Sequence, residues 1–183
     1  MRKNGYTLIE LLVALAVFTV VIAAPTGFFV SALKGQQKAL ASQELYDNVS
    51  YTLEYISRAL RMAKKDLTGS CISANMNYAT TTDGKGIAFK NYKGECQEFY
   101  WDTIDNRLKE TSGKGTGIPL TASSIEVVSF VLGGEDTWSQ DDAYQPKVTL
   151  FLKIKGKRGT LPELQPTMKI QTSVSQRNLD IRY

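Results

Sequence analysis

The sequence predicts an α+β fold in which one long N-terminal helix packs on an antiparallel β-sheet. Three observations lead to this prediction: an uncharged apolar segment near the N-terminus, an amphipathic segment after it, and strand-like alternation beyond residue 85. The chain has 183 residues, of which 43% are hydrophobic and 22% charged. This suits one modest domain with an appendage, and the composition argues against bulk disorder.

Composition also excludes several functions. The chain has no histidine, which rules out His-based triads, His–zinc sites and histidine acid–base catalysis. Its two cysteines cannot by themselves form a four-cysteine metal site or an iron–sulfur cluster. The net charge of +4 is too small to favour nucleic acid as a partner. Nothing in the sequence resembles an activated nucleophile, so we expect neither an enzyme nor a cofactor.

The N-terminal segment has the length and composition of a membrane span. Residues 11–33 form a run of 23 residues without a charge. As a helix this run is about 35 Å long, enough to cross the hydrocarbon core of a bilayer. Arg2 and Lys3 precede the run and favour a cytoplasmic N-terminus, with the rest of the chain exported.

One carboxylate, Glu10, lies at the start of this apolar segment. A charged acid at bilayer depth costs about 2.5–3.5 kcal/mol on insertion scales. It needs a partner, and no lysine or arginine follows before Lys34. We therefore expect the partner to come from another chain, or to be an α-amine freed by cleavage.

These residues resemble the leader of the type IV pilin and type II secretion pseudopilin family. The resemblance lies in a glycine, an aromatic residue and an acid in fixed register, here Gly5, Tyr6, Thr7, Leu8, Ile9 and Glu10. It implies cleavage after Gly5 by a prepilin peptidase and N-methylation of the new amine of Tyr6. It also implies that Glu10 forms an assembly salt bridge with the N-terminal amine of a neighbouring subunit. Most family members have phenylalanine where this chain has Tyr6, and Pro25 stands slightly earlier than the family's usual proline.

The resemblance further implies a domain plan, partners and a location. The expected parts are a leader at residues 1–5, an apolar half-helix at 6–33 that protrudes, an amphipathic half-helix at 34–67 and a β-rich head at 68–183. The implied partners are other pilin or pseudopilin subunits, the prepilin peptidase and methyltransferase, an inner-membrane assembly platform and membrane lipid. The precursor is expected to cross the bacterial inner membrane once, with its head outside the cytoplasm. The mature subunit then enters a pilus or pseudopilus at the cell surface or in the periplasm.

Two alternative roles for the apolar N-terminus stay open. A secretory signal could be cleaved after the small-x-small pattern of Val30, Ser31 and Ala32, or the segment could be an uncleaved anchor. Glu10 could be an interfacial acid that extends towards the headgroups. The alternative function is then a membrane-anchored or secreted binding module, such as a surface adhesin outside any filament.

An amphipathic helix is expected to continue from the apolar one. Its apolar residues recur every three or four positions, at Leu45, Val49, Leu53, Ile56, Leu60, Ala63 and Leu67. The turn signal at residues 66–69 predicts its end. We expect a single helix over about residues 6–66, with a kink near Pro25 and Gly27. The apolar stripe could also serve a coiled coil, but the strands that follow offer a sheet for it to cover.

Strands dominate beyond residue 85. Residues 87–92 and 97–101 flank Lys93 and Gly94, which predicts a hairpin, and residues 107–111 return after a turn at 102–106. Residues 125–132, 147–155 and 168–174 have strand patterns, the last two with strict alternation. Alternation predicts an antiparallel sheet with one face in solvent and the other on the helix. Residues 99–101 and the ending over 172–179 are similar to J/W-type minor pilins and pseudopilins.

Three further features admit a functional and a structural interpretation. Cys71 and Cys96 could form a disulfide in an oxidising compartment, or remain free thiols. Glu135, Asp136, Asp141 and Asp142 could bind calcium, but they lack EF-hand spacing, so a solvated loop is favoured and no metal is expected. A basic cluster could bind DNA, or protect a sheet edge from aggregation, which we favour; its members are Lys147, Lys153, Lys155, Lys157 and Arg158.

Overall fold

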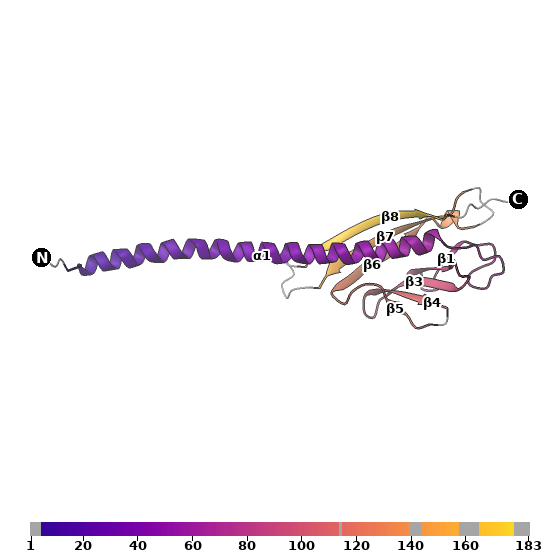
Figure 1. The fold of residues 1–183 in the computed structure, drawn as a ribbon, viewed down its shortest axis with the longest axis horizontal. Coiled ribbons are helices and arrows are strands. Elements are labelled where there is room, and N and C mark those ends of the chain that lie inside the picture. The colour runs from indigo at the N-terminus through magenta and orange to yellow at the C-terminus, as the bar shows by residue number, and fades with distance from the viewer. Residues whose placement is uncertain (1–4, 114, 140–143, 158–164, 178–183) are drawn as a thin grey trace. The chain divides into compact units, whose positions relative to one another are not determined.

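The computed structural model describes residues 5–113, 115–139, 144–157 and 165–177. The chain divides into two compact units, Met1–Leu40 and Ala41–Tyr183. Helix α1, Leu8–Arg61, runs through both units, and every strand among the described residues belongs to the second (Figure 1). The predicted α+β class, with one long helix and antiparallel sheets, is confirmed.

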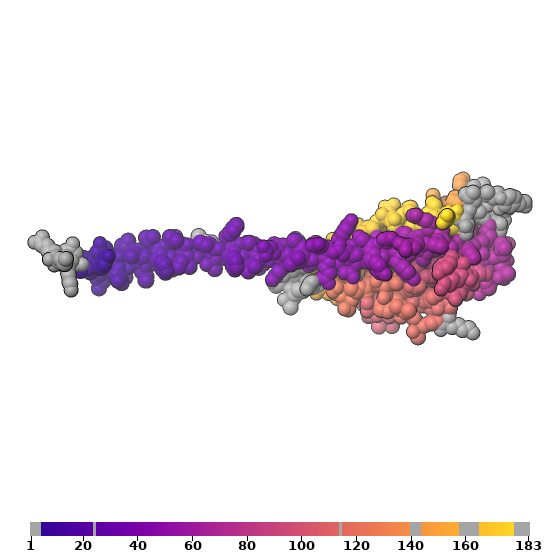
Figure 2. Space-filling view, viewed as in Figure 1, coloured from indigo at the N-terminus to yellow at the C-terminus, as the bar shows by residue number. Residues whose placement is uncertain are grey.

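The described part of the first unit is the apolar beginning of α1. Its described side chains are all exposed, and Figure 2 shows this segment as a rod one helix thick. α1 continues through Pro25 and Gly27, so the helix does not end there. Pro25 has no N–H to donate to the helix. The next residue, Thr26, adds a side-chain bond, because its hydroxyl donates to the carbonyl of Ile22 at 2.8 Å.

The second half of α1 has the predicted apolar stripe. Leu45, Val49, Ile56 and Leu60 are buried in the core of the second unit. Thr52 lies within the same stripe, and its hydroxyl donates to the carbonyls of Asn48 at 2.9 Å and of Leu120 at 3.2 Å. The stripe therefore covers the sheets of its own chain, as expected, rather than forming a coiled coil.

α1 ends at Arg61, five residues before the expected end near residue 66. The backbone beyond the helix forms bridges with later parts of the chain instead of continuing the helical pattern. The N–H of Lys64 donates to the carbonyl of Lys90 at 2.8 Å, and the N–H of Asp66 donates to the carbonyl of Met76 at 3.0 Å. These long-range bonds compete with the helical ones, and local sequence periodicity does not reveal them.

Five strands form the first sheet, in the order β1-β2-β3-β4-β5, with all pairs antiparallel. They are β1 (Tyr78–Thr80), β2 (Gly86–Lys90), β3 (Cys96–Asp102), β4 (Arg107–Ser112) and β5 (Ile118–Pro119). The predicted β2–β3 hairpin is confirmed, and Gly94 in its turn has a φ of 91°, which favours glycine. Asn106, in the predicted turn before β4, has a φ of 55°.

Three strands form the second sheet, in the order β6-β7-β8. They are β6 (Ile125–Gly133), β7 (Lys147–Gly156) and β8 (Thr167–Ser175), and both pairs are antiparallel. A short 3-10 helix, η1 (Glu135–Thr137), follows β6. The inward residues of β7 are Val148, Leu150, Leu152 and Ile154, which are all buried, so the predicted alternation is confirmed.

The two sheets and the second half of α1 share one hydrophobic core. Phe89 and Phe99 from the first sheet, and Phe130 and Leu152 from the second, belong to the same buried cluster as the helix stripe. β6 lies beside β2, β3 and β4, and the N–H of Val127 donates to the carbonyl of Asn106 at 2.8 Å. The prediction of one sheet was wrong, because alternation shows which face of a strand is buried but does not reveal its neighbours.

Candidate functional site

The candidate site is the segment that leads into α1. The helix begins at Leu8, so Gly5, Tyr6 and Thr7 precede it, and all three are exposed. Residues 1–4 of the expected leader lie outside the described residues. A Cβ atom added to Gly5 would meet no atom within 4 Å. The described chain therefore gives no steric reason for glycine at this position.

Thr7 and Glu10 bind each other at the helix start. The N–H of Glu10 donates to the Thr7 hydroxyl oxygen at 3.4 Å, and the N–H of Thr7 donates to Glu10 Oε2 at 3.3 Å. The Thr7 hydroxyl also donates to Glu10 Oε2, again at 3.3 Å. This is a capping box, in which residues three apart satisfy each other's backbone donors at the N-terminus of a helix.

The capping box changes the expectation for Glu10. Sequence reasoning left the carboxylate without a partner in its own chain, whereas the structure gives it two donors from Thr7. A carboxylate in the first turn is also favoured by the positive end of the helix dipole. The sequence signal was present, because threonine followed three residues later by glutamate is the capping-box pattern.

Beyond Glu10, the apolar surface of α1 is exposed in this chain. Side chains such as Leu11, Phe18 and Phe28 are 65%, 63% and 79% exposed. By length and hydropathy, α1 contains a segment able to cross a membrane. Surface of this kind is stable in lipid or against other apolar helices, but not in water.

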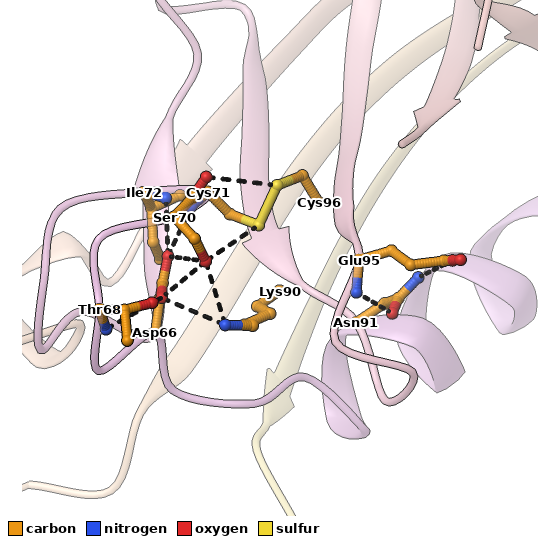
Figure 3. Close-up of polar contacts among 9 residues, drawn as sticks. All are labelled: Asp66, Thr68, Ser70, Cys71, Ile72, Lys90, Asn91, Glu95 and Cys96. Atoms are coloured by element: carbon orange, nitrogen blue, oxygen red, sulfur yellow. Dashed lines mark hydrogen bonds and ion pairs between the residues drawn. A yellow bond between two sulfur atoms is a disulfide. The ribbon is translucent and has the colours of Figure 1, made fainter. Parts of the chain in front are cut away.

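A second polar site lies just beyond α1, around Asp66 (Figure 3). The buried Asp66 carboxylate accepts the N–H of Cys71 at 2.6 Å, the N–H of Ile72 at 3.2 Å and the hydroxyl of Thr68 at 3.1 Å. Lys90 lies 3.4 Å from the same carboxylate. Burial by itself raises the pKa of Asp66, but the N–H and hydroxyl donors outweigh it and hold the pKa well below its usual range.

The same loop is joined to β3 by a disulfide. Cys71 and Cys96 form this bond, with their Cα atoms 5.1 Å apart and a separation of 25 positions in the sequence. Closing a loop of that length stabilises a fold by about 3 kcal/mol in the chain-entropy estimate. Asp66 and the disulfide therefore fix the same segment from two sides, which points to a structural role.

The acidic residues singled out from the sequence fall into two groups. Glu135 and Asp136 lie in η1. Asp141 and Asp142 lie outside the described residues. In the described parts of the chain, no three acidic, cysteine or histidine side chains gather where they could hold a metal ion.

The chain combines an α+β head, an apolar helix, and a capped acid that follows a glycine and an aromatic residue. In these features it resembles the type IV pilin-like proteins. Residues 1–24 match the prokaryotic N-terminal methylation motif. The pilin-like protein PilA3 of Thermus thermophilus is 36% identical over 61 residues, which are 33% of this chain. The resemblance to type IV pilins is thus confirmed.

The similarity to PilA3 is partial, since the matched segment spans 26% of that protein. No solved structure matches this chain. The membrane-competent helix and the methylation motif are together consistent with membrane anchoring.

Proposed function

We propose that this chain is a structural subunit, a minor pilin or pseudopilin, of a type IV pilus or type II secretion pseudopilus. It is made as a precursor in the inner membrane and cleaved by a prepilin peptidase between Gly5 and Tyr6. The new amine of Tyr6 is then methylated. The observation that most supports this function is the Thr7–Glu10 capping box at the start of an exposed apolar helix, within the matched methylation motif.

Assembly uses the same residues in a second arrangement. In the single chain, Glu10 Oε2 accepts two donors from Thr7, and the sequence has no lysine or arginine between Lys3 and Lys34. The amine that cleavage creates on a neighbouring subunit's Tyr6 is a charged donor, so its bond to the Glu10 carboxylate carries charge on both partners, whereas the Thr7 donors are neutral. Glu10 then sets the axial register, while packing of the apolar helices supplies most of the stabilisation.

Substitution of Glu10 tests the assembly role. We expect Glu10→Ala to leave membrane insertion and leader cleavage intact while the subunit is lost from the filament fraction. Glu98→Ala, which removes an exposed acid from the head, is the matched control and should be incorporated normally. The measurement is immunoblotting of sheared filaments and membranes from the native host. Normal incorporation of Glu10→Ala would show that Glu10 has no such role.

The second candidate function is a membrane-anchored or secreted binding module outside any filament. It would use the same apolar helix as a permanent anchor or a secretory signal. A mature chain that begins at Met1 would favour the anchor, and one that begins near Leu33 would favour secretion.

A further inference from the structure

The outer face of the second sheet is strongly basic. Four lysines have their side chains on this face: Lys147, Lys153 and Lys155 from β7, and Lys169 from β8. Arg158 of the predicted basic cluster lies outside the described residues. The sequence favoured a guard on a sheet edge as the reason for the β7 lysines. That interpretation is wrong, because β7 pairs with β6 on one side and with β8 on the other and is the central strand.

Two of these lysines repel each other. Lys153 and Lys169 are directly opposite in the β7–β8 register, where like charges are destabilising. Neither makes an ion pair with a described residue. Glu126 of β6 lies opposite Lys155 of β7. This one acid does not balance the four lysines, so the face stays net positive. A bound anion would offset the repulsion between Lys153 of β7 and Lys169 of β8.

A shallow hollow lies beside the lysine pair. Its volume is about 530 Å³, and its lining includes Ser129, Phe151, Lys153, Lys169 and Gln171. Phe151 is 40% exposed although it belongs to a central strand. The hollow thus brings two cations, an accessible aromatic ring and two hydrogen-bonding side chains together.

We infer that this face, the outer surface of β6, β7 and β8 around Phe151, binds single-stranded nucleic acid. Phosphates of the strand lie on Lys153 and Lys169, with Lys155 and Lys147 further along β7, while a base stacks on the Phe151 ring. Cationic tracks with interleaved aromatic rings bind single strands in this way, since every base has a face to stack. A duplex keeps its bases paired and would leave Phe151 without a partner.

The overall charge of the chain conceals this surface. A net charge of +4 gave no reason to expect nucleic acid, but the fold collects four lysines on one sheet face. The inference concerns the head alone and does not depend on filament assembly, so either proposal can fail without the other.

The test is binding of a fluorescent 20-nucleotide oligo-dT to the full chain in non-ionic detergent micelles, by anisotropy between 50 and 200 mM NaCl. We expect salt-dependent binding that is tighter than to a duplex of equal length. Lys153→Gln combined with Lys169→Gln should weaken binding. Each lost phosphate contact lowers the magnitude of the slope of log K against log salt by about 0.7, so the double variant should lower it by about 1.4. Phe151→Ala should weaken binding about fivefold or more without changing that slope.

The matched control removes two lysines from turns of the first sheet. Lys85→Gln with Lys93→Gln deletes the same amount of charge beside two other aromatic rings, Trp101 and Tyr92, and should leave the affinity near that of the parent chain. Circular dichroism verifies that each variant is folded. The inference is overturned if the parent chain does not bind, or if the control weakens binding as much as the Lys153–Lys169 pair. It is also overturned if phosphatidylglycerol vesicles bind equally well and Phe151→Ala has no effect on oligo-dT.

Discussion

Thr7 holds Glu10 at the first turn of α1, and this pair is the most local feature of the candidate site. We expect Thr7→Val to remove the hydroxyl that accepts the N–H of Glu10. Loss of an N-cap costs about 0.5–2 kcal/mol, so the Glu10 amide should exchange its hydrogen about 2- to 30-fold faster. NMR hydrogen exchange on the full chain in micelles measures this.

Thr19→Val is the control for the capping box. Its hydroxyl donates to the carbonyl of Leu15 within the helix and caps nothing. Exchange at Glu10 should therefore stay unchanged in this variant. Equal exchange in the parent chain and in Thr7→Val would mean that the capping box does not hold the helix start.

Asp66 gives a second prediction at the residue scale. Its folded pKa lies below the unfolded value of about 3.9, so its stabilising effect is present above that pH and is lost as pH falls below it. We expect Asp66→Asn to lower the unfolding free energy at pH 7 by about 1–3 kcal/mol, since buried N–H donors lose a charged acceptor. The variant should also lose less stability than the parent chain between pH 5 and pH 2.5.

Urea unfolding followed by tryptophan fluorescence measures both effects of Asp66→Asn. Asp83→Asn, an exposed aspartate in the β1–β2 turn, is the control and should change stability little. If Asp66→Asn had the same stability and the same pH dependence as the parent chain, the carboxylate would not organise the loop.

At the scale of elements, most of the fold follows from periodicity. Apolar spacing of three and four predicted the helix, and alternation predicted β7 with its buried face and β8 with its partly buried one. Pairing over long sequence distances was not predictable. The early end of α1 depends on Lys64 bonding to Lys90 of β2 and on Asp66 bonding to Met76, which precedes β1. The division into two sheets depends on which strands meet.

The β2–β3 pair contains a position where only glycine fits. A Cβ on Gly86 would lie 2.5 Å from the carbonyl oxygen of Phe99 and 2.6 Å from Cβ of Tyr100. We expect Gly86→Ala to destabilise the second unit by about 1–3 kcal/mol in urea unfolding, because the strands must move apart. Gly35→Ala has open space around it in α1 and should leave this transition unchanged. A neutral Gly86→Ala would mean that β2 and β3 are less closely packed than described.

At the scale of the whole molecule, the chain joins two units with different solvent requirements. The head buries its own core, whereas the apolar half of α1 exposes the side chains that need lipid or like helices. That contrast was readable from the sequence, as were the glycine, aromatic residue and acid at the start. The Thr7 partner of Glu10 and the lysine pair across β7 and β8 became visible only with the helix start and strand register in place.

The central claim is that the chain is processed at Gly5 for assembly, and the mature N-terminus tests it most directly. Intact-mass and peptide mass spectrometry of the protein from its native host should find N-methylated Tyr6 as the first residue. A chain that begins at Met1, or one that begins after Ala32, would contradict the claim.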